Sequence, residues 1–268
     1  MSRLADVLAR TREQGRAALV GYLPAGYPSV AASAAALVAM VEAGVDVVEV
    51  GLPYSDPLMD GPTIQSAVDQ ALAAGTSTAD VFRVVAEVAA TGAPVLVMSY
   101  WNPIERYGVD QFAAELAAAG GAGVITPDLI PDEAHELVSA TDTAGLDRVF
   151  LVAPSSSDDR LRYTAKHCRG FVYAASTMGV TGTRAQVGDA AAGLVRRTRA
   201  VTDLPVCVGL GVSTGDQAAE VAGFADGVIV GSAFVRRVLD APDPAAGCSA
   251  VATLATELAA GVRRGVPS

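Results

Sequence analysis

Glu49 is the first candidate for acid–base chemistry. It lies near the end of the apolar run Val45–Val50, where a carboxylate is costly unless it is paired or close to solvent. Desolvation there raises the pKa of a carboxyl group, which suits a general acid–base. A strand-end Glu paired with a neighbour is the alternative, but catalytic groups gather at the carboxyl ends of barrel strands, which favours function.

The segment that follows, Gly51–Gln65, contains three prolines and two aspartates. Such a stiff loop holds its carboxylates with little entropy left to lose. Asp56 and Asp60 are both candidates for a second polar group. Because Asp-Pro and Asp-Gly are common turn pairs, turn chemistry explains either aspartate taken alone slightly better than function does.

Glycines at two consecutive strand ends favour a phosphate site. One apolar run leads into Gly209–Gly211, and the next leads into Gly231 and Ser232. Glycine lets the backbone approach a phosphate, Ser232 adds a hydroxyl, and Ser232–Val238 would be the short helix whose N-terminus faces the anion. Gly182, in the loop after the sixth strand, could close the third side. Ordinary strand-to-helix turns are the alternative.

Several kinds of chemistry lack the residues they need. The only lysine, Lys166, lies in a helix-patterned stretch, which argues against a Schiff base. The two histidines, His135 and His167, have no metal-ligand spacing, so we expect no metal. The three cysteines fit neither a disulfide framework nor a zinc motif, and indicate a reducing compartment. Acid–base chemistry by carboxylates, with a tyrosine as assistant, remains.

Short apolar runs alternate with helix-patterned stretches along the whole chain. Eight strands are expected: Ala18–Leu23, Val45–Val50, Pro94–Met98, Gly123–Thr126, Arg148–Val152, Gly170–Ala174, Pro205–Val208 and Gly227–Val230. Helices are expected at Val30–Glu42, Thr78–Ala90, Val109–Ala119, Pro131–Thr141, Asp158–His167, Asp189–Val201 and Thr214–Ala222. This alternation predicts parallel βαβ units and a single (β/α)₈ TIM-barrel domain over residues 1–268. An open doubly wound sheet is the alternative, but the dinucleotide fingerprint is missing after the first strand.

The remaining segments complete this picture. The second and sixth strands are followed by long connections, Gly51–Gly75 and Ser176–Gly188, at the end of a barrel where active sites form. Met1–Gly15 has the pattern of a short amphipathic helix and not of a secretory leader. Asp240–Ala246 is expected to be a loop before a final helix, Val251–Arg264.

Charge and hydropathy exclude some classes of binding partner. The net charge of −10 argues against nucleic acid or an anionic membrane surface. The apolar runs are too short to span a membrane. Local phosphate binding by backbone N–H groups stays compatible with this charge. We therefore expect a cytoplasmic protein with a small-molecule substrate.

The segment Glu49–Gln65 closely resembles the signature of the tryptophan synthase α subunit. The resemblance continues along the chain in Gly26–Pro28, Tyr100–Ile104, Pro127–Leu129, Gly179–Gly182, Gly209–Gly211 and Asp226–Ser232. The chain is identified as a member of this family. The resemblance implies a lyase of tryptophan biosynthesis, which cleaves indole-3-glycerol phosphate to indole and glyceraldehyde 3-phosphate by a retro-aldol reaction.

The resemblance also implies a role for each site residue. Glu49 would protonate indole C3 and also take the glycerol hydroxyl proton, while Asp60 would accept a hydrogen bond from the indole N–H. Tyr173 would assist proton transfer, and Thr181 would help the loop after the sixth strand to close and orient Asp60. The remaining expected contacts are Tyr22 and Met98 on the indole, and Gly182, Gly211, Gly231 and Ser232 on the phosphate.

A partner follows from the same resemblance. It is the β subunit, which holds pyridoxal phosphate in an αββα heterotetramer, with Pro53 and Asp56 of this chain in contact with it. This chain would need no cofactor of its own. A non-catalytic barrel that only binds and activates the β subunit is the alternative, against which Glu49 and Asp60 argue. Two other barrel enzymes, indole-3-glycerol phosphate synthase and phosphoribosylanthranilate isomerase, use a lysine or a cysteine that this chain lacks at the required places.

Overall fold

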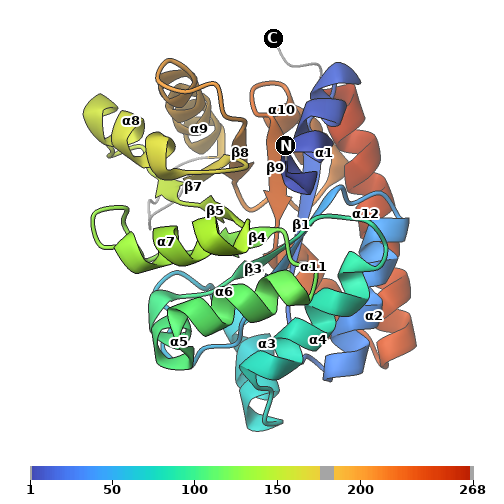
Figure 1. The fold of residues 1–268 in the computed structure, drawn as a ribbon. Coiled ribbons are helices and arrows are strands. Elements are labelled where there is room, and N and C mark those ends of the chain that lie inside the picture. The colour runs from blue at the N-terminus through green and yellow to red at the C-terminus, as the bar shows by residue number, and fades with distance from the viewer. Residues whose placement is uncertain (1, 176–183, 266–268) are drawn as a thin grey trace.

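The computed structural model describes residues 2–175 and 184–265, in which parallel strands form a barrel surrounded by helices (Figure 1). The strands of the described residues are β1 Ala18–Pro24, β2 Val47–Gly51, β3 Val95–Met98, β4 Gly123–Ile125, β5 Asp147–Val149, β6 Leu151–Val152, β7 Val172–Ala175, β8 Val206–Gly209 and β9 Gly227–Val230. Their order in the sheet is β5-β4-β3-β2-β1-β9-β8-β7-β6. The (β/α)₈ barrel expected from the sequence is therefore confirmed.

Nine strands occur where eight were expected because Phe150 interrupts the fifth. Among the described residues β5 pairs with β4 and β6 pairs with β7, so the two halves of the expected strand Arg148–Val152 form opposite edges of the sheet. The backbone carbonyl of Phe150 accepts a hydrogen bond of 3.2 Å from the N–H of Tyr173. The chain itself closes the barrel at this interruption.

The described helices are α1 Arg3–Glu13, α2 Val30–Glu42, α3 Pro62–Ala73, α4 Thr78–Ala89, α5 Trp101–Tyr107, α6 Val109–Ala118, α7 His135–Ala144, α8 Asp158–His167, α9 Arg184–Arg199, α10 Gly215–Ala222, α11 Ser232–Leu239 and α12 Pro244–Arg264. Most match an expected helix, but α3 and α5 were not expected. The connection Gly51–Gly75 thus contains a helix, which leaves a loop over residues 52–61 and a turn over residues 74–75. In the connection Ser176–Gly188, residues 176–183 lie outside the described part and α9 begins at Arg184.

The last helix begins earlier than expected. The Asp243 side chain accepts a hydrogen bond of 2.8 Å from the N–H of Ala246 and so caps α12, with Pro244 at its first position. Both are standard helix-start features, and the expected loop Asp240–Ala246 is correspondingly shorter. Among the described residues, α12 is the one helix long and apolar enough to cross a membrane. Its buried face packs on α2 and α10, so α12 is part of the layer of helices that surrounds the barrel.

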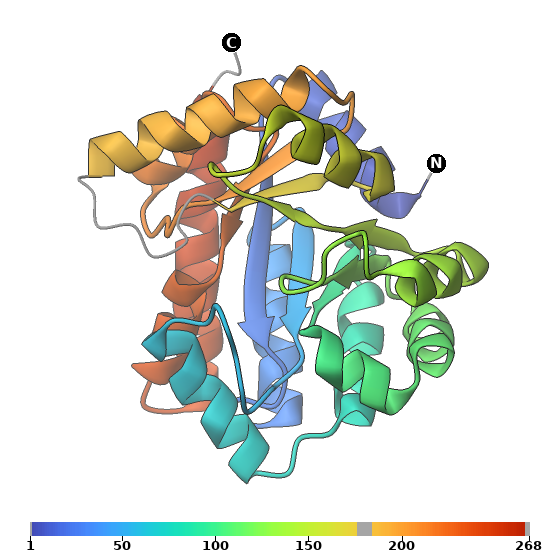
Figure 2. The same cartoon turned by 90° about the vertical axis from the view of Figure 1, so that its left-hand side faces the viewer.

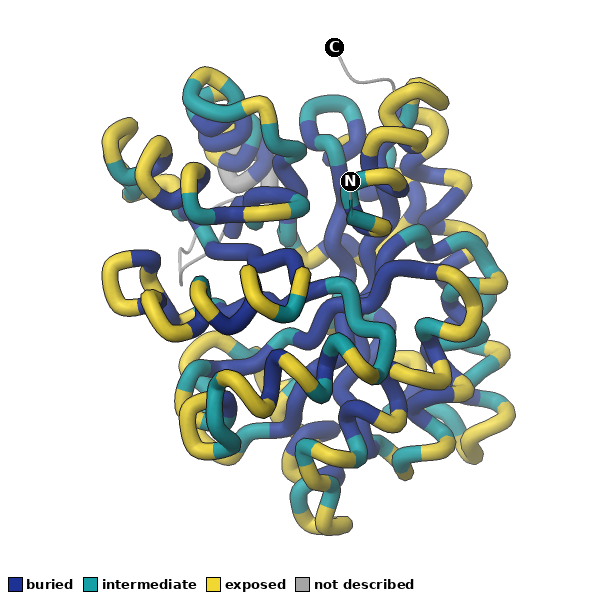
Figure 3. Tube along the Cα trace, in the orientation of Figure 1, coloured by how far each residue is buried: buried dark blue, intermediate teal, exposed yellow. Residues whose placement is uncertain are grey.

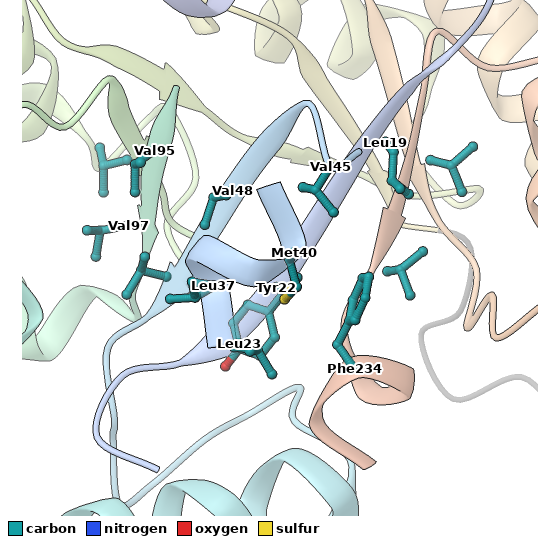
Figure 4. Close-up of a cluster of buried hydrophobic side chains, with 14 of the residues drawn as sticks. Leu19, Tyr22, Leu23, Leu37, Met40, Val45, Val48, Val95, Val97 and Phe234 are labelled. Atoms are coloured by element: carbon teal, nitrogen blue, oxygen red, sulfur yellow. The ribbon is translucent and has the colours of Figure 1, made fainter. Parts of the chain in front are cut away.

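Side chains alternate between the two faces of each strand, which produces two apolar layers. Outward residues such as Leu19 and Val48 belong to an outer cluster that also contains Leu37 and Met40 of α2 (Figure 4). The strands are buried, whereas the outer faces of the helices are exposed (Figure 3).

Inward residues fill the amino-terminal half of the barrel. Ala18, Val47 and Phe171 form part of an inner cluster. Leu4 and Leu8 of α1 close this cluster at the amino end of the strands. Ser2 caps α1, and its Oγ donates a hydrogen bond of 2.5 Å to Asp147 at the start of β5. The helix α1 thus lies at one end of the barrel and α3 lies at the other (Figure 2). Because α1 seals the amino end, the open cavity lies at the carboxyl end of the strands.

Candidate active site

The inward residues nearest the carboxyl ends of the strands surround a cavity of about 270 Å³. Its walls are Tyr22, Glu49, Met59, Asp60, Gly61, Ile64, Met98, Leu151, Tyr173, Ala175, Gly209, Gly211, Ile229, Gly231 and Ser232. Most lie at the carboxyl end of a strand or just after one, the place where TIM-barrel active sites form.

Glu49 points into this cavity because of strand periodicity. Val47, two residues earlier, lies in the inner cluster, so Glu49 faces inward as well. The side chain is 1% exposed, and its Oε1 has no hydrogen-bond partner among the described residues. Burial raises the pKa of Glu49 to about 8. The carboxyl group is therefore mostly protonated at neutral pH and can donate a proton.

Asp60 is held by a tyrosine that the sequence had not singled out for this role. The Tyr100 hydroxyl donates a hydrogen bond of 3.0 Å to Asp60 Oδ1 and accepts one of 3.0 Å from the N–H of Met59. Burial raises the pKa of Asp60, while the Tyr100 hydrogen bond opposes that rise. Tyr100 belongs to the segment Tyr100–Ile104 noted in the family resemblance, but nothing local relates it to a residue 40 positions away.

Two glycines make room for the tyrosines of the cavity. A Cβ atom on Gly51 would lie 2.3 Å from the Tyr22 hydroxyl oxygen, and one on Gly209 would lie 2.5 Å from the hydroxyl of Tyr173. Burial, with a smaller contribution from the carboxyl group of Glu49, raises the pKa of Tyr173. Tyr173 therefore remains neutral and offers a hydroxyl proton. The sequence suggested that Gly209 approaches phosphate, whereas the structure shows it packed against a tyrosine ring.

Another part of the cavity wall combines a glycine turn with a helix start. Gly211 has a φ of +62°, a left-handed conformation that favours glycine. Gly231 is the N-cap of α11, and within the described residues no side chain caps that end. Ser232 begins the helix and is exposed. Unpaired helix N–H groups and the helix dipole make such an end suitable for an anion.

The cavity brings together most of the residues that the sequence and the resemblance had indicated: Tyr22, Glu49, Asp60, Met98, Tyr173, Gly211, Gly231 and Ser232. Thr181 and Gly182 lie outside the described residues. Pro53 and Asp56 instead line a separate surface hollow with Tyr54 and Asn102, whose side-chain amide donates a hydrogen bond of 3.0 Å to the Tyr54 hydroxyl. The described residues contain no cluster of His, Cys, Asp and Glu able to hold a metal ion.

Comparison with known proteins gives a consistent result. The family model described as tryptophan synthase alpha chain matches residues 8–263. The tryptophan synthase alpha chain of Thermobifida fusca is 64% identical over 98% of both chains, and that of Salinispora tropica is 63% identical over 100% of both. A crystal structure of tryptophan synthase from M. tuberculosis, in an aminoacrylate-bound form, superposes with a TM-score of 0.89 at 52% identity. It covers 98% of this chain and 100% of that one.

Proposed function

Since this chain belongs to the tryptophan synthase alpha chain family, we propose that Glu49 and Asp60 perform the family's reaction in the cavity described above. The chain cleaves indole-3-glycerol phosphate to indole and glyceraldehyde 3-phosphate in tryptophan biosynthesis. The role of each residue in the reaction follows from the family resemblance, and the geometry of the cavity supports it.

Glu49 acts first as an acid and then as a base. Its neutral carboxyl group donates a proton to indole C3, which turns the ring into an indoleninium cation. The resulting carboxylate then takes the proton of the hydroxyl on the carbon attached to the ring. As that carbonyl forms, the bond to C3 breaks and its electrons return to the ring, which leaves indole and the aldehyde. A pKa of about 8 suits both transfers, because the group is mostly protonated at neutral pH and so can donate, while its carboxylate is basic enough to take the hydroxyl proton.

Asp60 stabilises the cation formed in between. Its carboxylate accepts a hydrogen bond from the indole N–H, which gains positive charge on protonation. The Tyr100 hydrogen bond occupies Oδ1 and leaves Oδ2 for the ring. Tyr22 and Met98 form walls for the indole, and Tyr173 offers its hydroxyl to the proton transfers.

Gly211, Gly231 and Ser232 bind the phosphate. The N-terminus of α11 directs backbone N–H groups to it, and the Ser232 hydroxyl adds a further donor. Because of the family resemblance, we propose that Gly182 also contacts the phosphate. For the same reason, we propose that Thr181 helps the loop after the sixth strand to close.

The loop over residues 52–61 supplies the surface for the β subunit. Pro53 and Asp56 line the hollow beside it, and Leu58 is 77% exposed. We propose an αββα complex in which pyridoxal phosphate belongs to the β subunit and this chain, one domain over residues 1–268, works in the cytoplasm without a cofactor. The described cysteines are free, as a reducing compartment implies.

The buried carboxyl group of Glu49, whose Oε1 has no hydrogen-bond partner among the described residues, is the observation that carries the proposal. We expect Glu49→Gln to lower indole formation from indole-3-glycerol phosphate by about 10²–10⁴-fold, the usual scale for loss of a general acid–base. Asp60→Asn should reduce turnover by more than any accompanying fall in the melting temperature can account for. Asp69→Asn, an exposed carboxylate on α3, is the control. Near-wild-type turnover of Glu49→Gln would contradict the assignment of the acid–base role to Glu49.

A further inference from the structure

Arg236 links the helix at the phosphate end of the cavity to the segment that bears Asp60. Its Nη2 donates a hydrogen bond of 2.7 Å to Thr63 Oγ1, across 173 positions of sequence. The two residues come from α11 and α3, which pack against each other. No other side-chain hydrogen bond described here joins these two helices.

The position of Thr63 gives this bond its significance. Gly61 is the N-cap of α3, so Asp60 comes immediately before the helix and Thr63 lies in its first turn. Gln65, in the same turn, donates a hydrogen bond of 2.7 Å from Nε2 to the backbone carbonyl of Asp60. Any shift of the start of α3 therefore moves Asp60 relative to the cavity.

The position of Arg236 connects the same bond to the other end of the cavity. Arg236 lies four residues after Ser232, hence on the same side of α11. Helical side chains lean towards the N-terminus, so the guanidinium extends towards the helix start that faces the cavity. None of the described lining residues carries a positive charge. Arg236 thus brings a cation to the junction of α11 with α3.

We propose that Arg236 is a positioning residue, which fixes the first turn of α3, and with it Asp60, against the helix that binds phosphate. When phosphate holds the start of α11, the bond to Thr63 transmits that position to Asp60. The inference rests on the proposed role of Asp60 and extends it to two residues outside the cavity wall.

Thr63 and Arg236 can be tested separately because only one of them is charged. Thr63→Val removes the acceptor and keeps the cation, so we expect kcat for indole-3-glycerol phosphate to fall about 3–10-fold with KM within about twofold. Thr63→Ser keeps a hydroxyl and should restore kcat. Arg236→Ala should lower kcat to a similar extent, and adding Thr63→Val should lower it no further. Arg237→Ala, the neighbouring exposed arginine on α11, is the matched control for charge.

Three results would overturn the inference: wild-type kcat in Thr63→Val, failure of Thr63→Ser to restore kcat, or multiplicative losses in the double variant. Melting temperatures measured in parallel separate a loss of positioning from a loss of folding. Asp60→Asn, assayed beside these variants, keeps the two proposals distinct. If Asp60→Asn is inactive and Thr63→Val keeps wild-type kcat, only the positioning role of Arg236 and Thr63 is wrong; if Asp60→Asn is fully active, the role of Asp60 is wrong.

Discussion

Glu49 shows at the scale of one residue how burial produces reactivity. The side chain lies inside the barrel between neighbours on β1 and β3, and its Oε1 has no partner among the described residues. Without a compensating cation, burial favours the neutral form, which raises the pKa from 4.5 to about 8. The unfolded chain solvates this carboxyl group, so its pKa returns to the ordinary value there.

This shift predicts a pH-dependent stability difference. Between the unfolded pKa of 4.5 and the folded pKa of about 8, the folded state binds more protons, so Glu49 makes the protein less stable as pH rises. Glu49→Gln removes that dependence. We expect its free energy of unfolding, relative to wild type, to increase by a few kcal/mol, about 1.4 per pKa unit, from pH 5 to pH 8. Urea unfolding at several pH values measures this, and a difference that is flat with pH would contradict a raised Glu49 pKa.

At the scale of elements, the outer helices are fitted to one another by small residues. Gly261 of α12 lies so close to α10 that a Cβ atom there would be 2.2 Å from the backbone oxygen of Gly215. The same contact includes a hydrogen bond of 2.8 Å from the N–H of Gly215 to Glu257 of α12. A Cβ atom on Gly247, on the same helix, would lie 3.7 Å from its nearest neighbour, which is an ordinary van der Waals contact.

The two glycines of α12 should therefore respond in opposite directions to alanine. Gly261→Ala forces the helices apart and should lower the free energy of unfolding by about 1–3 kcal/mol. Gly247→Ala meets no obstacle and should raise it by up to about 1 kcal/mol through helix propensity. Urea unfolding of both variants measures the contrast. Equal effects would show that the approach of α12 to α10 is not constrained.

At the scale of the whole molecule, the barrel separates stability from chemistry. The helix α1 seals the amino end with fully buried side chains, while the cavity opens at the carboxyl end. Substitutions at the two ends should therefore have different consequences.

Leu4, fully buried under the barrel, tests this separation. We expect Leu4→Ala to lower the free energy of unfolding by about 2–5 kcal/mol through lost burial and a residual cavity. Below its melting temperature the variant should keep its kcat. Arg3→Ala, exposed on the same helix, should change stability by less than about 0.5 kcal/mol. A fall in kcat without unfolding would show that the amino end contributes to the geometry of the site.

Local patterns were sufficient for much of this description. Alternation of apolar runs with helix-patterned stretches predicted the barrel and placed Glu49 near the end of the second strand, because both depend only on neighbouring residues. The turn-forming glycines predicted the phosphate end at Gly211 and Gly231 for the same reason. The roles of Asp60 and Tyr173 came from the family resemblance, since turn chemistry accounts slightly better than function for an isolated Asp-Gly pair.

Contacts between distant segments were decided only in the tertiary structure. Neither the Tyr100–Asp60 bond nor the Arg236–Thr63 bond has a local signature, because the partners are 40 and 173 positions apart. The interruption at Phe150 is equally non-local, since the two halves of that strand pair with different neighbours. Sequence periodicity determines which way a side chain points, but closure of the barrel determines what it meets there. The carboxylates could therefore be found from the sequence, whereas the groups that hold them in place could not.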